Sequence, residues 1–211
     1  MSVNRNIYIV GLTGGIASGK SEAAKYLESL GAHCVDADAI SHFLTGRDGP
    51  LLTDIRREFG DGVFNEDGTL DRQALADIVF SDDDKRRTLD AITHPSIQKA
   101  MLDEVEDAEK AGEKIIFLNV PLLFETGMDA LCDETWLIST QKDLQLTRLM
   151  QRDGFDEKQA QSRVRSQMSA EDKEQRASVV IDNNRSIEKM LGELQSHYNS
   201  LVKRVSRMET E

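Results

Sequence analysis

Residues 7–21 read Ile-Tyr-Ile-Val-Gly-Leu-Thr-Gly-Gly-Ile-Ala-Ser-Gly-Lys-Ser, and this stretch decides the fold. Residues 7–12 are apolar and rich in β-branched side chains, which is typical of a strand buried on both faces of a parallel sheet. The glycine-rich segment that follows predicts a tight turn. Residues 21–30 then place apolar side chains at helical spacing, and Gly31 occupies the position of a C-terminal helix glycine. The stretch therefore predicts a strand, a turn and a helix.

Gly14–Ser21 fits the pattern G-x-x-x-x-G-K-[ST] of a phosphate-binding loop, the P-loop. Glycines allow the backbone to approach phosphate oxygens, and successive N–H groups form an anion nest at the positive end of the next helix. Lys20, expected to face solvent, can reach the β- and γ-phosphates, and the Ser21 hydroxyl can bind Mg²⁺. The pattern assigns binding of a nucleoside triphosphate to Gly14, Gly15, Ile16, Ala17, Ser18, Gly19, Lys20 and Ser21.

A second short strand, residues 33–35, ends at Asp36-Ala37-Asp38. In parallel α/β sheets, ligands lie in the crevice at the carboxyl ends of the strands. A carboxylate there can accept a proton from an attacking hydroxyl or hold a Mg²⁺-bound water. The alternative is that Asp36 and Asp38 cap a helix that begins at Ala39. One of the two can cap the helix while the other takes part in the chemistry.

The remaining chain predicts further strands and helices around this opening. The strands are expected at residues 114–120, 134–139 and 179–181, and the helices at 51–59, 72–80, 84–111 (broken near His94-Pro95), within the arginine-bearing stretch 144–168, and over 187–205. The last helix has the clearest apolar stripe, which predicts a helix docked on the core. The predicted fold is α/β, a parallel five-stranded sheet flanked by helices. We expect a single P-loop domain, with a core (about 1–41, 112–147 and 177–211), a helical insertion (about 42–111) and a further helical segment (about 148–176).

Composition limits the classes of function. The 211 residues include 26 Lys and Arg against 38 Asp and Glu, a formal charge of −12, which disfavours a protein that coats nucleic acid. Cys34 and Cys132 are too few for a disulfide framework and are typical of a reducing compartment. No apolar run approaches the roughly 20 residues of a membrane helix. We therefore expect a cytoplasmic protein with a small-molecule substrate, without nucleic acid, membrane or an obligate protein partner.

Several motifs occur together in the order seen in dephospho-CoA kinases. They are Leu12–Ser21, Asp36-Ala37-Asp38, His94-Pro95, Pro121-Leu122-Leu123-Phe124-Glu125, Gln151-Arg152-Asp153 and Val180-Ile181-Asp182-Asn183. The chain resembles this family from Ile7 to about Val205. It departs from the family at Ala17, where Gly is frequent, and at Glu22, where Thr is commoner. The methyl group of Ala17 is expected to be tolerable if that residue has a negative φ.

The resemblance implies a P-loop kinase fold, in which the helical insertion (about 42–111) binds the acceptor and the helical segment at about 148–176 is a lid. It also implies ATP- and Mg²⁺-dependent phosphorylation of the ribose 3′-hydroxyl of dephospho-CoA, the last step of coenzyme A synthesis. It makes Asp38 the base or orienting group, and Asp36 a support for the strand end or the metal shell. His94 would begin a turn lining the acceptor pocket, or would simply form a helix-breaking corner. The residues implied to bind the acceptor are Thr13, Asp36, Asp38, His94, Leu123, Phe124 and Glu125, with plain packing as the alternative for Leu122 and Leu123.

Basic residues gather between Arg148 and Arg165, where five positive side chains face three negative ones. Arg148 and Arg152 are four residues apart and share a helix face. A mobile, arginine-bearing lid can stabilise the charge of a phosphoryl-transfer transition state, so we expect Arg148 to be catalytic and Arg152 to bind ATP. The excess of charge has no evident partner in the sequence, although pairing with neighbouring acids is the alternative.

Two rival functions remain. A kinase of nucleoside monophosphates is disfavoured, because its phosphate acceptor is already an anion and does not need the carboxylate of the Asp-Ala-Asp element. A nucleotide-binding switch is disfavoured because the guanine-reading sequence N-K-x-D does not occur.

Overall fold

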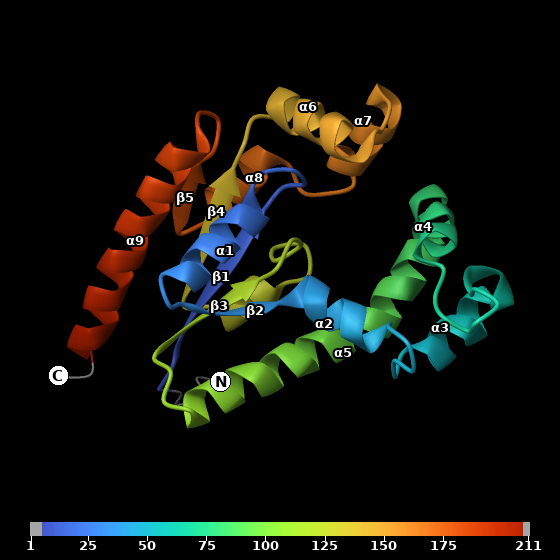
Figure 1. Cartoon of the computed structure of the whole chain (residues 1–211), viewed down its shortest axis with the longest axis horizontal. Coiled ribbons are helices and arrows are strands. Elements are labelled where there is room, and N and C mark those ends of the chain that lie inside the picture. Colours follow the sequence, from blue (N-terminus) through green and yellow to red (C-terminus); the bar gives the residue numbers. More distant parts are fainter. Residues whose placement is uncertain (1–5, 209–211) are drawn as a thin grey trace. The chain divides into compact units, whose positions relative to one another are not determined.

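The computed structural model describes residues 6–208 and contains one five-stranded sheet (Figure 1). The strands are β1 (Tyr8–Gly14), β2 (His33–Asp36), β3 (Ile115–Asn119), β4 (Glu134–Ser139) and β5 (Val179–Asp182). Their order in the sheet is β2-β3-β1-β4-β5, with β1 parallel to both β3 and β4, and β4 parallel to β5. The predicted α/β fold with a parallel five-stranded sheet is confirmed. Consecutive residues of a strand point to opposite faces, and both Ile9 and Val10 of the central β1 are buried, as its continuous apolar sequence predicted.

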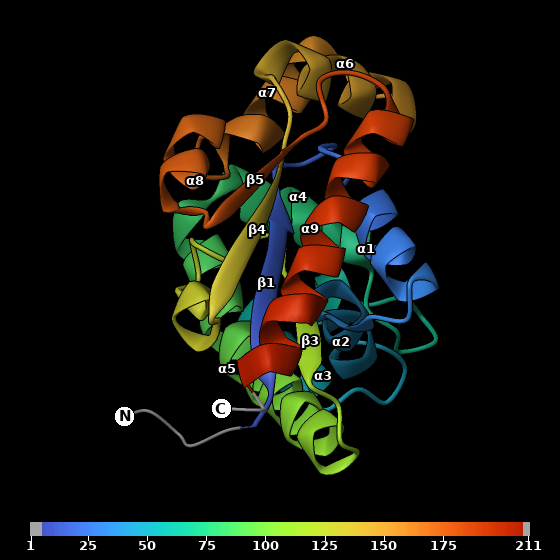
Figure 2. The ribbon, with the colours of Figure 1, turned by 90° about the vertical axis from the view of Figure 1, so that its left-hand side faces the viewer.

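Helices flank the sheet and make up most of the remaining described chain. They are α1 (Lys20–Ser29), α2 (Ala37–Leu44), α3 (Leu52–Phe59), α4 (Arg72–Ser81), α5 (Asp83–Lys110), α6 (Lys142–Asp153), α7 (Glu157–Arg165), α8 (Ala170–Arg176) and α9 (Ile187–Met208), with 3-10 turns at Asp61–Val63 and Met128–Leu131. Helices α1 and α9 cover one face of the sheet, and α8 lies on the other (Figure 2). Successive side chains of β4 point to opposite faces of the sheet, so Trp136 packs toward α9 while Ser139 bonds to Glu174 of α8.

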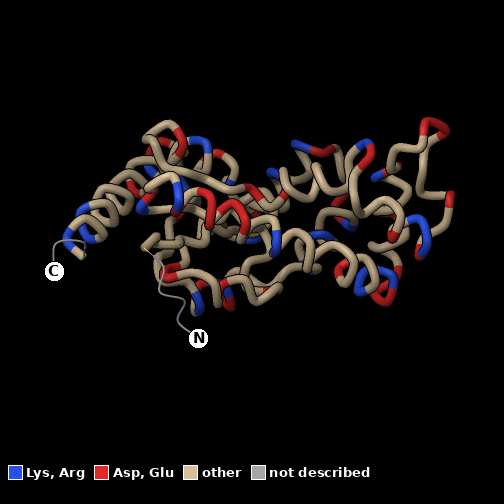
Figure 3. The backbone as a smooth tube through the Cα atoms, turned by 90° about the horizontal axis from the view of Figure 1, so that it is seen from below, with Lys and Arg blue, Asp and Glu red and all other residues tan. Residues whose placement is uncertain are grey.

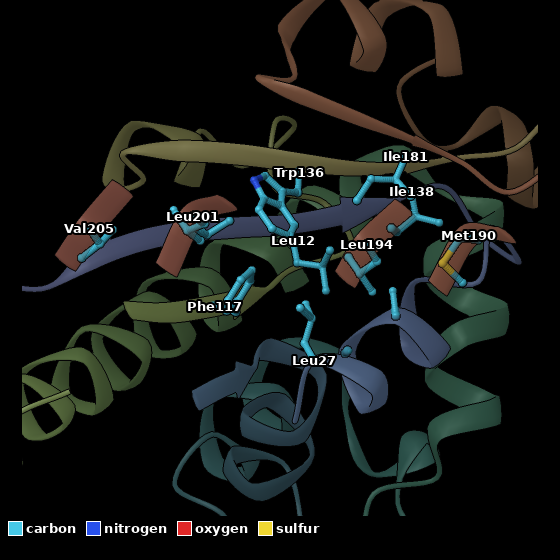
Figure 4. Close-up of a cluster of buried hydrophobic side chains, with 13 residues drawn as sticks. Leu12, Leu27, Phe117, Trp136, Ile138, Ile181, Met190, Leu194, Leu201 and Val205 are labelled. Carbon is cyan, nitrogen blue, oxygen red and sulfur yellow. The ribbon is translucent and has the colours of Figure 1, made fainter. Parts of the chain in front are cut away.

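The main hydrophobic core lies between the sheet and the helices α1 and α9 (Figure 4). Phe117 of β3 and Trp136 of β4 meet edge to face, with ring centroids 5.3 Å apart. The apolar stripe predicted for the last helix is buried at Met190, Leu194, Leu201 and Val205. The prediction of a docked C-terminal helix is therefore confirmed.

Contacts divide the chain into two compact units. The first comprises the chain up to Val35 together with the chain from Val105 onward, and it holds the core described above. The second is Asp36–Glu104, whose own core consists of Leu51, Ile55, Val63, Leu75 and Val79. The boundaries expected for the insertion (42–111) and the lid (148–176) stay predictions.

Helix α5 is not broken at Pro95, which corrects the expected break and turn at His94-Pro95. A proline inside a helix removes one N–H donor and crowds the carbonyl four residues before it. Thr93 before the proline and Met101 after it are both buried, and their packing keeps the helix continuous. The Thr93 hydroxyl also donates a hydrogen bond to the Leu89 carbonyl. Tertiary packing thus overrides the local preference.

Charged side chains of both signs are interspersed along the chain (Figure 3). On α5, for example, Lys99 pairs with Asp103 at 2.6 Å and Lys110 pairs with Glu106 at 2.9 Å. Both pairs are separated by four residues and lie on exposed helix faces, where solvent screens the attraction and such pairs contribute little to stability.

Candidate active site

The P-loop connects β1 to α1 and has the backbone path that its glycines predict. Gly19 is the N-cap of α1 with φ +94°, in the left-handed region. A β-carbon on Gly19 would lie 2.3 Å from Asn183 Nδ2, and one on Gly14 would lie 2.4 Å from Ser18 Oγ. Glycine is required at both positions by neighbouring atoms. No side chain caps α1 at Gly19, which is the arrangement expected of a helix N-terminus that binds an anion.

Ala17 has φ +58°, so the negative φ at which its methyl group was expected to be tolerable does not occur. The Ser18 N–H donates to the Gly15 carbonyl at 3.0 Å, and within this turn Ala17 lies in the left-handed region. A β-carbon is disfavoured there because it approaches the following carbonyl oxygen. The chain accommodates alanine at this position with local backbone strain.

Lys20 is buried rather than facing solvent, which corrects the expectation from sequence. Its side-chain Nζ donates a hydrogen bond to Asn119 Oδ1 at 2.5 Å. Asn119 ends β3 beside Leu12 of β1, so the two parallel strands bring the asparagine to the P-loop lysine. Sequence reasoning did not select Asn119, although a polar residue that ends an apolar strand was a usable indication.

Asn183, which follows β5, connects the P-loop to two other elements. Its Nδ2 donates to the Ser18 carbonyl at 2.7 Å, and its backbone N–H donates to the Ser139 carbonyl at 2.8 Å. Arg148 Nη2 in turn donates to the Asn183 carbonyl at 3.1 Å, and the Thr140 hydroxyl donates to the Ser18 carbonyl at 3.1 Å. Asn183 belonged to a recognised motif but was not selected as a site residue.

Two buried polar atoms at this point, Ser18 Oγ and Asn183 Oδ1, have no hydrogen-bond partner among residues 6–208. Unpaired buried polar atoms cost free energy, so they are rare in folded proteins and concentrate at functional positions. Their place directly behind the phosphate-binding turn fits a loop whose conformation is set by ligand binding as well as by packing.

The arginines expected in the lid have defined contacts. Arg148 of α6 bonds to the Asn183 carbonyl, as described above. Arg152 forms two hydrogen bonds of 2.8 Å with the Asp153 carboxylate, which raise the pKa of Arg152 and lower the pKa of Asp153. The expectation that the local excess of charge lacks a partner is therefore wrong for Arg152. Arg163 stacks on the Phe155 ring with its guanidinium carbon 4.2 Å from the ring centroid.

The segment Pro121–Glu125 follows β3 and is held by α8. Leu123 and Phe124 are buried, in agreement with the packing alternative for Leu123. The Thr13 hydroxyl donates to the Pro121 carbonyl at 3.1 Å. Glu125 Oε1 lies 2.9 Å from Lys173 Nζ, and the Lys173 side chain is only 1% exposed. This ion pair, in which the lysine is buried, ties the segment to α8, and no pattern in the sequence indicated Lys173.

A cavity of about 810 Å³ lies beside the P-loop in the first unit. Its lining includes Gly15 of the P-loop, Gln145 of α6, and Gln167, Met168 and Lys173 around the start of α8. The volume is in the range of sites for small molecules and cofactors. The P-loop therefore borders a space that is large enough for part of a nucleotide-sized ligand.

Asp36, Asp38 and His94 belong to the second unit. Asp36 is the N-cap of α2, because its Oδ1 accepts hydrogen bonds from the N–H groups of Asp38 at 2.7 Å and Ala39 at 3.0 Å. The capping alternative thus holds for Asp36, although α2 begins at Ala37 rather than Ala39. Asp38 is exposed in the first turn of α2, and His94 Nε2 lies 3.4 Å from Asp90 Oδ1 within α5.

Comparison with known proteins identifies the family. The family model described as dephospho-CoA kinase matches residues 8–189. The chain belongs to the dephospho-CoA kinase family. A dephospho-CoA kinase of Symbiobacterium thermophilum is 41% identical over 192 residues, which is 91% of this chain and 80% of the relative. A second, from Bacillus licheniformis, is 40% identical over 179 residues, or 85% and 89% of the two chains.

Solved structures agree with this family. A Thermus thermophilus protein called TT1252 has a TM-score of 0.78 and 33% identity, covering 93% of this chain and 99% of its own. A dephospho-CoA kinase from Campylobacter jejuni has a TM-score of 0.68 and 29% identity, covering 94% and 98%. A shikimate kinase from Acinetobacter baumannii, 15% identical with a TM-score of 0.52, shares the fold alone.

As a member of the dephospho-CoA kinase family, the chain is a kinase. The residues expected from sequence fall into two groups: the P-loop, the Pro121–Glu125 segment and the arginines in the first unit, and Asp36, Asp38 and His94 in the second. Among residues 6–208, the helices are all too short or too polar to cross a membrane.

Proposed function

We propose that this chain transfers the γ-phosphoryl group of ATP to the 3′-hydroxyl of the ribose of dephospho-CoA, giving coenzyme A and ADP. The observation that carries the proposal is the P-loop with Lys20 at the start of α1, in a chain that the dephospho-CoA kinase family model covers from residue 8 to 189. In the reaction, the 3′-oxygen forms a bond to the γ-phosphorus and the bond from that phosphorus to the β–γ bridging oxygen breaks. The hydroxyl proton passes to a base, and ADP leaves.

The P-loop is assigned to the phosphates of ATP. The N–H groups at the start of α1 and the Lys20 ammonium offset the negative charge that the phosphates bring. The Lys20 Nζ is oriented by its hydrogen bond to Asn119, which keeps the charge directed rather than mobile. A lysine held in this way loses little conformational entropy when the nucleotide binds.

Mg²⁺ fits the same place. Ser21 is exposed in the first turn of α1, so its hydroxyl can reach a cation at the phosphates. Mg²⁺ favours one or two protein oxygens together with phosphate oxygens and water, and when bound it neutralises charge that develops on the phosphoryl group. Ser21 would therefore hold the metal without a dedicated cluster of carboxylates.

Asp38 is proposed as the group that accepts the proton of the 3′-hydroxyl. Asp36 already accepts two backbone N–H bonds as the cap of α2, whereas Asp38 is exposed two residues after the end of β2. Ligands of parallel α/β folds bind beyond the carboxyl ends of the strands, and β2 ends at Asp36. The division of labour is then that Asp36 fixes the start of α2 and Asp38 performs the proton transfer.

The remaining assignments follow the same proposal. Arg148 would stabilise charge on the transferred phosphoryl group, and Arg152 would bind ATP after leaving Asp153. Residues 42–111 would bind the acceptor and residues 148–176 would act as the lid. A cytoplasmic location belongs to the same proposal, because two cysteines are too few for the disulfide framework of a secreted protein.

A coupled assay of ADP release tests the proposal directly. We expect ADP release that depends on dephospho-CoA and Mg²⁺, with no turnover when AMP or shikimate replaces dephospho-CoA. Melting temperatures add a second readout, since a bound substrate stabilises the fold by mass action. Transfer to AMP instead would support the monophosphate-kinase alternative, and release of ADP without any acceptor would support a hydrolytic switch.

A matched pair of lysine variants separates the P-loop from general charge effects. Lys20 and Lys25 both lie on α1, but the Lys25 side chain is 71% exposed and pairs only loosely with Glu22 at 3.5 Å. Lys25→Ala is expected to leave turnover unchanged, while replacement of Lys20 abolishes it. Equal loss in both variants would contradict the assignment of the P-loop.

A further inference from the structure

A glutamine far away in the sequence holds the tip of the P-loop. Gln167 lies between the end of α7 and the start of α8, and its side-chain Oε1 accepts the backbone N–H of Ile16 at 2.8 Å. Ile16 immediately precedes Ala17, the residue with φ +58°. The N–H of Ile16 is thus satisfied by a side chain from the proposed lid rather than by a backbone carbonyl of the loop itself.

Contacts of the next two residues fix the backbone directly after Gln167. The N–H of the next residue, Met168, donates to Glu125 Oε1 at 2.9 Å, and the same oxygen pairs with the buried Lys173. Ser169 then caps α8 by accepting the N–H of Asp172 at 3.1 Å. A side chain that starts from an anchored backbone can position its partner, because little freedom remains at its own base.

We propose that Gln167 is a positioning residue that holds the P-loop in the conformation that binds ATP. The loop contains one residue with a strained backbone and two unpaired buried polar atoms close by, so its conformation needs support from outside. A loop that is ordered before the nucleotide arrives pays less conformational entropy on binding. The inference rests on the proposed use of the P-loop for the phosphates of ATP.

The chemistry of an amide suits this role better than that of a carboxylate. Both accept an N–H hydrogen bond, but a carboxylate would bring a negative charge to a loop whose N–H groups receive phosphates. Glutamine supplies the acceptor without the charge. Gln167 also lines the cavity beside Gly15, so truncating its side chain enlarges a solvent-filled space instead of leaving a void in the core.

Three substitutions at Gln167 test the proposal, with Gln175→Ala on the exposed side of α8 as the matched control. Gln167→Ala removes the acceptor, and Gln167→Asn withdraws it by one methylene group. Both are expected to raise the KM and the dissociation constant for ATP about 2- to 10-fold, the range that loss of one hydrogen bond predicts. The kcat should stay within about twofold, the KM for dephospho-CoA should not change, and the Ile16 amide should exchange faster with solvent.

Gln167→Glu distinguishes positioning from a merely structural contact. It keeps the acceptor, so the exchange rate of the Ile16 amide and the melting temperature should return to the wild-type values. The added charge should weaken the binding of ATP at least as much as Gln167→Ala does. Wild-type affinity for ATP in both the Glu and the Ala variant would overturn the proposal in favour of a structural role. Tighter ATP binding in Gln167→Ala would overturn it too, because the glutamine would then be blocking the loop.

Amide exchange at Ile16 and calorimetric ATP binding need no acceptor substrate. If ATP binds as expected and dephospho-CoA is not phosphorylated, the proposed function fails and the role of Gln167 stands. If exchange at Ile16 is the same in the wild type and in Gln167→Ala, the hydrogen bond does not restrain the loop and the role of Gln167 fails, whatever the acceptor.

Discussion

Replacing Ala17 with glycine is expected to stabilise the protein. Ala17 is one of two non-glycine residues in residues 6–208 with a positive φ, the other being Asp48 at +61°. A β-carbon in the left-handed region costs about 1–2 kcal/mol. Glycine removes this cost, but its greater conformational freedom stabilises the unfolded chain by about 0.4–1 kcal/mol. Taken at the middle of the two ranges, the difference favours the glycine variant by about 0.8 kcal/mol.

Thermal unfolding measures this difference. For a chain of this length, 1 kcal/mol corresponds to about 2–4 °C, so Ala17→Gly should raise the melting temperature by about 1–4 °C. Asp48→Gly should give a smaller rise, because aspartate tolerates the left-handed region better than alanine. Ala91→Gly, in an exposed part of α5, should lower stability by about 1 kcal/mol, the ordinary cost of glycine inside a helix.

The sign of the change decides the matter. If Ala17→Gly lowers the melting temperature as much as Ala91→Gly does, then Ala17 is not in a left-handed conformation and the reasoning about the loop is refuted. The measurement should be made without nucleotide, because ATP would add its own stabilisation through the same loop.

Three further predictions concern turnover. Lys20→Met keeps the length of a buried side chain but removes its charge. We therefore expect at least about 100-fold loss of kcat with a melting temperature close to wild type. ADP release near the wild-type rate would contradict the role of the P-loop lysine. Asp38→Asn should lose about 100-fold in kcat while ATP still binds. Asp36→Asn should lose less, because asparagine caps a helix as well as aspartate does. The reverse order of kcat losses in steady-state assays would mean that the two roles are exchanged. Arg148→Ala should lower kcat more than it raises the KM for ATP, since an interaction made only in the transition state appears in the rate constant, and unchanged kinetics with both substrates varied would exclude Arg148 from the site.

The sequence by itself determined the elements and the kind of site. The apolar run before the P-loop predicted a strand buried on both faces, and the structure places that strand at the centre of the sheet. The repeat of apolar residues near the C-terminus predicted the docked helix α9. These patterns are reliable because burial of a helix or strand on one or both faces requires apolar side chains at regular spacing in the local sequence. The P-loop was equally visible, because its glycines, lysine and serine are contiguous.

Only the tertiary structure decided how the loop is held. Lys20 bonds to Asn119 across 99 residues, Asn183 bonds to Ser18 across 165, and Gln167 bonds to Ile16 across 151. None of these contacts has a local pattern, because each depends on strand order and on how α7 and α8 return to the sheet. The same holds where packing overrode a local preference: α5 continues through Pro95 because residues on both sides of it are buried. Local sequence records which side chains are buried, whereas the partner of a polar group is set by chain segments that meet only when the protein has folded.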